Sequence, residues 1–292
     1  MLFCYHRYIL VVGDIMLQKD IEYQRSLTVV KSNDMIRQGR FDLSLVEQRI
    51  VLYIVSKIKP GDIEFRTITM SIREFCAVTG ITYQQNLSQL KDNIKSLADK
   101  SIWFQRPGTK TKTLIRWIEK PELEEDTDTV RIRLDSDLMP YLLQLRSNFT
   151  EYELLNILAL RSRYSVRLYE LLKSYLHIGH HEITIEQLRD YLRITEGYEQ
   201  TKYFNRDVVV PAVSEINEYT DIEIECQYMK KGRNISGYRF IITEQTENVN
   251  ILAKAYLSGK RPSKHRRKTE LKAAIEQLQQ QIEMEQLQIE MD

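Results

Sequence analysis

The sequence contains few of the residues that build disulfide frameworks or zinc sites. Only three cysteines occur among 292 residues, at Cys4, Cys76 and Cys226, and no two of them form a CxxC pair. Closely spaced cysteines are the usual sign of a disulfide-stabilised or zinc-binding chain. Their absence predicts a protein of a reducing cytoplasm, with no metal and no other cofactor.

Long apolar runs are also missing. The most apolar stretch near the start, residues 8–17 (YILVVGDIML), contains Asp14 and is only about ten residues long, where a membrane-spanning helix needs about twenty. Arg7 precedes this stretch as in a signal peptide, but no small-residue cleavage site follows it. No membrane partner is expected. Residues 1–25 are interpreted as an N-terminal extension, and a start of translation at Met16 in place of Met1 stays open.

An excess of one charge is absent as well. Lysine and arginine number 42 against 41 for aspartate and glutamate, so the total charge indicates no class of partner, and only its distribution can. The length, with 42% hydrophobic residues, is sufficient for two domains that each bury a core.

The motifs of common enzyme classes are not found. The sequence has neither GxGxxG nor GxxxxGK[ST], so no dinucleotide or phosphate-binding loop is predicted. The HIGH string at His177–His180 copies an aminoacyl-tRNA synthetase signature, but it closes a predicted helix where the signature opens one. A rolling-circle nickase needs two histidines separated by one apolar residue, whereas His180 and His181 are adjacent. We therefore predict no catalytic residue, and a tyrosine nickase stays as the enzymatic alternative.

The clearest positive signal is an internal duplication of helix starts. Each half has one capping box before an apolar run and then one before a short helix. In the first half these are Ser44 with Glu47 and Ser71 with Glu74, and in the second half they are Thr150 with Glu153 and Thr184 with Gln187. Each half continues with an amphipathic helix, a β-like run and a hairpin, whose loops are RPGTKTK (106–112) and MKKGRN (229–234).

Helix, strand, helix, turn, helix and hairpin is the order of a winged helix-turn-helix domain. The predicted fold class is therefore α+β and mainly helical, with two such domains in tandem, at residues 26–148 and 149–246. The joint is placed near residues 147–149, after a helix that holds Leu138, Leu142 and Leu145. The acidic stretch 119–128 (EKPELEEDTD) is interpreted as an exposed loop, which DNA would repel.

Residues 247–292 form a tail of different composition. The block KRPSKHRRK (260–268) carries six lysines or arginines and no acid. The Gln- and Glu-rich remainder has helical spacing of Leu271, Ile275, Leu278, Ile282 and Leu287, which fits an amphipathic helix or short coiled coil. A solvated tail is the alternative.

The second half offers the better candidates for reading DNA bases. Its second helix begins near Thr201, with an expected buried stripe of Phe204, Val208, Val209, Ala212, Val213 and Ile216. This leaves Lys202, Asn205 and Arg206 toward the major groove, where asparagine and arginine suit adenine and guanine edges. The hairpin would add Lys230, Lys231, Arg233 and Asn234 against phosphates. Pro211 should bend this helix or remove one hydrogen bond. An ordinary solvated face is the alternative for these charges.

The first half is less basic along its corresponding helix and hairpin. The helix carries Gln84, Gln85, Asn86, Gln89, Lys91 and Lys95, and the hairpin taken as its wing carries Arg106, Lys110 and Lys112. Phosphate contact or dimerisation is the role expected of this half.

Several segments together resemble the theta-type plasmid replication initiator (Rep) family. They are SNDMIRQGRFDLSLVEQRIVLYIVSKI (32–58), YSVRLYELLKSYL (164–176), ITIEQLRDYL (183–192) and RDVVVPAVSEINEYTDIEIECQYMKKGRNISGYRFII (206–242), and the match as a whole covers about residues 28–243. The resemblance implies a DNA replication initiator with tandem winged helices that binds repeated double-stranded origin sequences (iterons), mainly through its second domain. It also implies homodimerisation through the first domain, repression of its own promoter and recruitment of host replication proteins, a helicase or an initiator. It further places Arg167 and the basic hairpin at or near DNA. A winged-helix transcriptional repressor without initiator activity is the alternative function.

Overall fold

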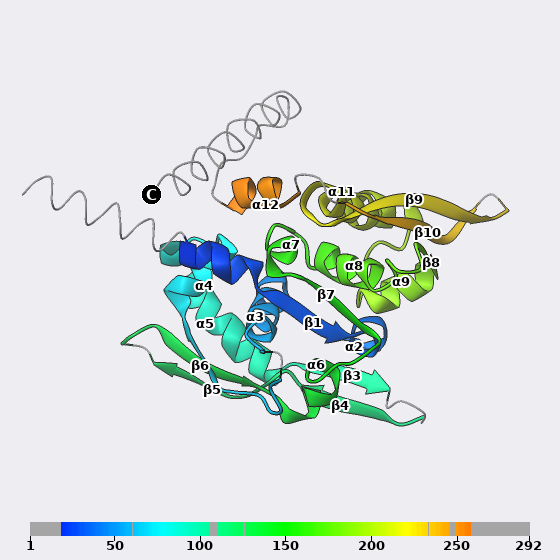
Figure 1. Ribbon diagram of the computed structural model, residues 1–292. Coiled ribbons are helices and arrows are strands. Elements are labelled where there is room, and N and C mark those ends of the chain that lie inside the picture. The colour runs from blue at the N-terminus through cyan, green and yellow to red at the C-terminus, as the bar shows by residue number, and fades with distance from the viewer. Residues whose placement is uncertain are drawn as a thin grey trace, which may run out of the picture.

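The computed structural model describes residues 19–59, 61–105, 110–124, 126–232, 234–245 and 249–257. Within these ranges the chain forms the two tandem winged-helix units that the sequence predicted (Figure 1). None of the helices in this part of the chain combines the length and the apolar character needed to cross a membrane. Residues 1–18 and 258–292 lie outside the described ranges, and so do Met16, the basic block 260–268 and the predicted tail helix.

The second unit has the simplest winged-helix topology. It comprises a first helix, a strand, two further helical segments and a hairpin: α8 (Arg163–Lys173), β8 (His180–Thr184), α9 (Ile185–Tyr191), α10 (Thr201–Phe204) continuing through η2 (Asn205–Val209) into α11 (Val210–Tyr219), then β9 (Ile222–Lys231) and β10 (Asn234–Glu244). The strand order is β8-β10-β9, so the strand before the helices pairs with the second strand of the hairpin. Figure 1 shows β9 and β10 as a long hairpin that extends beyond α11.

The first unit repeats this topology with one insertion. Its corresponding elements are α3 (Leu45–Val55), β2 (Ile68–Ser71), α4 (Ile72–Thr79), α5 (Tyr83–Asp99), β5 (Ile118–Glu124) and β6 (Thr129–Leu134), with strand order β2-β6-β5. The RPGTKTK hairpin, β3 (Ser101–Gln105) and β4 (Lys112–Arg116), forms a separate two-stranded sheet between α5 and β5.

Two interpretations of the first half are therefore wrong. By topology the wing is the β5–β6 hairpin, because β6 pairs with β2 as β10 pairs with β8, so the β3–β4 hairpin is not the wing. The acidic stretch 119–128 is not a loop throughout, because residues up to Glu124 form β5 and pair with β6.

Three of the four predicted helix starts are confirmed by their side-chain caps. Ser44 and Thr184 form reciprocal capping boxes, and the Ser71 hydroxyl accepts from the backbone of the third helical residue. Thr150 does not cap a helix: it lies in β7 (Phe149–Glu153), which pairs antiparallel with β1 (Thr28–Ser32) and leads into α7 (Leu154–Leu158). Strand pairing with a distant segment has overridden the local motif.

The predicted helix before the joint is shorter than expected. A 3-10 turn, η1 (Ser136–Leu138), is followed by α6 (Met139–Leu142), which ends before Leu145. Because β1 pairs with β7, the first strand of the chain lies beside residues that follow the expected joint near 147–149.

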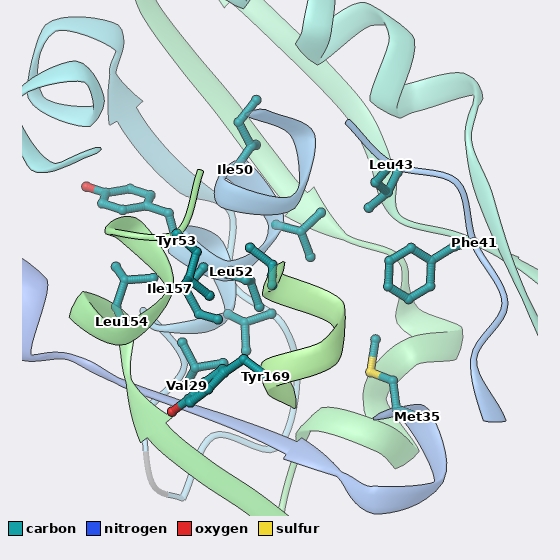
Figure 2. Close-up of a cluster of buried hydrophobic side chains, with 14 of the residues drawn as sticks. Val29, Met35, Phe41, Leu43, Ile50, Leu52, Tyr53, Leu154, Ile157 and Tyr169 are labelled. Atoms are coloured by element: carbon teal, nitrogen blue, oxygen red, sulfur yellow. The ribbon is translucent and has the colours of Figure 1, made fainter. Parts of the chain in front are cut away.

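A continuous hydrophobic core joins the two units. Figure 2 shows Val29 and side chains of α3 gathered with Leu154, Ile157 and Tyr169 of α7 and α8, and Met35 of α2 (Asn33–Gln38) beside Phe41 in the same cluster. The described ends of the chain also pack on this body. In the helix at 19–26, the Arg25 guanidinium donates to the backbone of Val78 and Ala77 at 2.8 and 3.1 Å, and Ala253 of α12 (Val249–Leu257) is buried beside α7 and α11.

Candidate nucleic-acid interface

The second helix of the second unit is interrupted by a π-helical turn. The Val210 N–H donates to the Asn205 carbonyl in the i→i+5 spacing of a π turn, and Pro211 follows without an N–H of its own. The prediction that Pro211 disrupts the regular hydrogen bonding of this helix is therefore confirmed, because the π turn directly precedes it. In the predicted buried stripe, Val213 is partly buried and the other five residues are buried, namely Phe204, Val208, Val209, Ala212 and Ile216.

The exposed side of this helix and the wing line a shallow, open hollow of about 640 Å³. The helix contributes most of the lining and β10 contributes the rest: Thr201, Lys202, Asn205, Arg206, Val210, Asn234 and Ile235. Sequence reasoning placed four of these residues in one interface, and the structure brings them together. The hollow thus combines a positive charge, amide groups and an apolar patch, as a surface that reads base edges does.

Arg206 is held in place by its neighbour in the sequence. Its Nε and Nη2 donate to the two carboxylate oxygens of Asp207 at 2.6 and 2.8 Å, and its guanidinium carbon lies 4.9 Å from the ring centre of Tyr203. The hydrogen bonds from Arg206 lower the pKa of the Asp207 carboxyl, which therefore stays ionised. The Arg206 side chain remains 63% exposed, so its outer edge faces solvent.

Asn205 is oriented from the wing. The Tyr238 hydroxyl donates to the Asn205 Oδ1, and burial raises the pKa of Tyr238, which keeps the hydroxyl protonated as a donor. With its oxygen engaged, Asn205 offers the amide N–H₂ to the hollow. A paired contact to adenine uses both the oxygen and the N–H₂, and the oxygen has a second lone pair, so the adenine role expected of Asn205 is compatible with the Tyr238 bond.

The wing of the second unit presents basic groups beyond the hollow. Lys230, Lys231 and Asn234 are exposed at the end of the β9–β10 hairpin, and Lys202 is exposed on the helix. Arg233 lies outside the described residues. The arrangement places exposed lysines on the hairpin and Asn205 and Arg206 on the helix, and their roles toward phosphates and bases stay predictions.

The corresponding helix of the first unit is partly covered by an acidic wing. The Lys91 ammonium lies 2.9 Å from the Asp128 carboxylate, which also accepts from the Tyr83 hydroxyl. These hydrogen bonds lower the pKa of Asp128, and the bond from Tyr83 contributes more than the bond from Lys91. The carboxylate therefore stays ionised beside α5. Lys95 is exposed on the same helix.

The remaining candidates of the first half lie apart from this helix. Lys110 and Lys112 are exposed on the β3–β4 hairpin, and Arg106 lies outside the described residues, as do the side chains of Gln84 and Gln85. The structure therefore does not gather the first-half candidates at one surface as it gathers those of the second half.

Arg167 lies in the interior. Its side chain is stacked between the rings of Phe41 and Tyr191, with 3.9 and 4.1 Å from the guanidinium carbon to each ring centre, and its Nη2 donates to the Gly39 carbonyl at 2.9 Å. Burial lowers the pKa of this group, and only 3% of the residue is exposed. In this arrangement Arg167 joins the α2–α3 connection to α8 and α9, and it presents no surface to DNA.

Sequence reasoning missed Asp207, Val210, Ile235 and Tyr238 of this site, and it identified Thr201 only as the start of the helix. The sequence shows that Asp207 follows Arg206. Whether the two side chains meet depends on their directions, which the π turn sets. In the part of the chain that the structure describes, no group of three or more histidine, cysteine, aspartate or glutamate side chains is placed to hold a metal ion. His181 stacks on Tyr175 with ring centres 4.0 Å apart.

Comparison with known proteins follows the two structural units. The initiator replication protein WH1 family model matches residues 28–173, and the initiator Rep protein WH2 model matches residues 184–242. A replication initiation protein of Escherichia coli is 23% identical over 216 residues, which cover 71% of this chain and 66% of the relative. A probable replication protein rep of Bifidobacterium longum (strain NCC 2705) is 26% identical over 181 residues, 56% of this chain and 59% of the relative.

The matched part of the chain thus spans less than two thirds of the length of each of these two relatives. Among solved structures, the crystal structure of the Pi initiator protein in complex with iteron DNA superposes with a TM-score of 0.63 at 22% identity, covering 77% of this chain and 99% of that one. This likeness shows a shared fold.

Proposed function

Because this chain belongs to the initiator replication protein family, we propose that it initiates plasmid replication by binding repeated double-stranded sequences at an origin. One observation of the structure carries the proposal: the helix and wing of the second unit line an open hollow that presents Lys202, Asn205 and Arg206, and exposed lysines lie on the same hairpin. Groups of this kind at a helix that enters the major groove read base edges, while cations on a wing fix the protein on phosphates. The relative of known structure was solved with iteron DNA, which supports the same class of ligand.

The two units have different roles in this proposal. The second unit reads the sequence, because its exposed helix face carries an arginine and an asparagine that are both oriented by neighbours. The first unit is assigned dimerisation and accessory phosphate contact, the roles that the resemblance implies for it. Its wing carries Glu119, Glu122 and Glu124, and its Lys91 is paired with Asp128. Acidic groups beside DNA weaken binding, so base reading by this wing is disfavoured.

Opening of the origin is assigned to partners from the host. The sequence has no phosphate-binding loop of the GxxxxGK[ST] type, so unwinding driven by ATP would come from a recruited helicase or initiator in the cytoplasm. The protein itself acts as a binding protein. Purified chain should neither hydrolyse ATP nor leave a covalent tyrosine adduct on a supercoiled origin plasmid.

A transformation assay tests the function directly. The gene and its adjacent repeats are placed on a DNA circle that has no other origin, and stable transformants are counted. The Arg206→Ala variant should lose the replicon, and Arg66→Ala should keep it, because Arg66 is an exposed arginine paired with Asp62 in the connection between α3 and β2, outside the helices and wings of both units. A replicon that is never maintained with the intact gene, although the protein binds the repeats, would favour a simple repressor.

A further inference from the structure

The Arg206–Asp207 pair leaves a defined set of donors free. A guanidinium has five N–H groups, and Asp207 accepts one from Nε and one from Nη2. The remaining donors are both hydrogens of Nη1 and one of Nη2, which lie side by side on the end of the planar group. Two adjacent parallel donors match the O6 and N7 acceptors of guanine in the major groove, and no other base presents this pair.

A carboxylate such as Asp207 weakens DNA binding, so its presence at a DNA surface needs a reason. Holding Arg206 in one orientation is such a reason. An exposed ion pair contributes little to stability, and a carboxylate near phosphates weakens binding by repulsion. Its side chain is 35% exposed, and it lies beside a hollow that otherwise carries Arg206 and Lys202. Fixing the arginine in one orientation offsets this repulsion, because a free arginine loses considerable side-chain entropy when it binds. Tyr203 limits the guanidinium further by lying against it.

Val210 adds an apolar group to the same hollow. It is 53% exposed, although valine at an exposed helix position gains nothing from the core, and it lies one turn after Arg206. The methyl group of thymine is the apolar feature of the major groove, and small aliphatic side chains contact it. The methyl group of a thymine beside the guanine would therefore contact the Val210 side chain.

We propose that Asp207 is a positioning residue that aims Arg206 at a guanine, and that Val210 contacts the methyl group of a neighbouring thymine in each origin repeat. The proposal rests on the function proposed above and adds the bases that the second unit reads. Asn205, oriented by Tyr238, contributes its amide N–H₂ to an acceptor on the same edge.

Base analogues test the guanine contact atom by atom. The duplex is the repeat that the wild-type chain protects from cleavage, and each guanine is replaced in turn by 7-deazaguanine, which lacks the N7 acceptor. At one guanine the wild-type chain should lose about ten-fold or more in affinity. Arg206→Ala should bind the normal and the substituted duplex equally. If no guanine is sensitive to the replacement, or if Arg206→Ala keeps the sensitivity, the assignment of Arg206 is overturned.

The Asp207 variants separate positioning from simple charge. Asp207→Ala and Asp207→Asn should bind scrambled duplex at least as well as the wild type, because a repelling charge is gone, yet their loss on 7-deazaguanine should shrink to a few-fold. Glu218→Gln, which removes a carboxylate on the far part of α11, serves as the matched control and should keep the full loss. If both Asp207 variants keep the ten-fold loss, Asp207 has no positioning role.

Uracil replacement tests Val210 independently. Exchange of one thymine for uracil removes only a methyl group and should lower wild-type affinity about four-fold, and Val210→Ala should be indifferent to it. Equal losses in both proteins would overturn the Val210 contact. A wild-type chain that protects no repeat at all contradicts the proposed function, whereas a protected repeat that is insensitive to these analogues contradicts only the present inference.

Discussion

The Lys31 ammonium donates to the Glu170 carboxylate at 2.7 Å, and both side chains are only 2% exposed. The two residues are 139 positions apart, on β1 and α8, and the Tyr152 hydroxyl of β7 donates to the same carboxylate oxygen at 2.6 Å. Three segments that are distant in the sequence are therefore tied at one buried carboxylate. A charge at this depth is tolerated only while it is paired and hydrogen-bonded.

Breaking this pair from one side should destabilise the protein strongly. Lys31→Met or Glu170→Gln should lower the free energy of unfolding by about 3–5 kcal/mol, because each leaves a buried polar group or charge without its partner. Replacing both, as Lys31→Met with Glu170→Leu, should cost less than either alone. Urea unfolding measures these values, with Arg66→Ala as a control, since that arginine is 64% exposed and its bridge to Asp62 should contribute at most about 1 kcal/mol. A cost near that of the control would show that the buried pair is not needed.

Arg167 should matter for stability and not for DNA. Arg167→Ala should lower the free energy of unfolding by about 2 kcal/mol or more, since it removes the desolvated stack between Phe41 and Tyr191. Binding of the folded variant to the repeat, and the dependence of that binding on salt, should match the wild type. Unchanged stability with a salt slope reduced by about one unit would instead place Arg167 on a phosphate.

His181 should make stability depend on pH. Burial, with the nearby charges of Arg37 and His180 outweighing Glu182, lowers the pKa of His181 from 6.5 to about 4. The folded state therefore holds the neutral ring while the unfolded state takes up a proton, so the free energy of unfolding should fall as pH decreases from about 6.5 to 4 and then stop changing on this account. The loss should be about 1–2 kcal/mol after allowance for partial exposure.

The His181→Phe variant isolates this contribution, because phenylalanine keeps the stack on Tyr175 and cannot titrate. Its stability should change less between pH 6.5 and 4 than that of the wild type, and His177→Gln, at an exposed position, should behave like the wild type. Identical pH profiles for the wild type and His181→Phe would refute the assignment.

The sequence was informative where structure depends on neighbours along the chain. Ser44, Ser71 and Thr184 were identified as helix starts because a hydroxyl three residues before an acid or amide caps a helix locally. Thr150 has the same spacing and lies in a strand, because its pairing with β1 involves residues more than a hundred positions away. The first wing was misplaced for the same reason: the basic loop 106–112 suggested it, but the pairing of β6 with β2 decides it.

The candidate site shows the same division. Lys202, Asn205 and Arg206 were predicted from helical spacing, and the structure gathers them with Asn234. The support of Arg206 by Asp207 and of Asn205 by Tyr238 depends on side-chain directions that a π turn alters. The interior position of Arg167 depends on two aromatic rings from separate segments, which no local pattern reveals.

Binding to DNA should weaken steeply with salt, and the wing should account for part of this. Lys230 and Lys231 are exposed at the end of the β9–β10 hairpin, where a cation that contacts a phosphate releases a counterion. Lys231→Ala should reduce the slope of log affinity against log salt by about one unit. Affinity that stays flat between low and physiological salt would show that phosphates are not contacted.

The affinity ratio between the repeat and a scrambled duplex, measured at several salt concentrations, tests the central assignment of the second unit most directly. The wild-type chain should prefer the repeat at every salt concentration. Arg206→Ala, checked for correct folding, should lose about 1–3 kcal/mol of that preference, whereas Lys231→Ala should weaken both duplexes alike and keep the ratio. A preference that survives Arg206→Ala but is lost with Lys231→Ala would contradict the account, because it would place sequence reading on the wing.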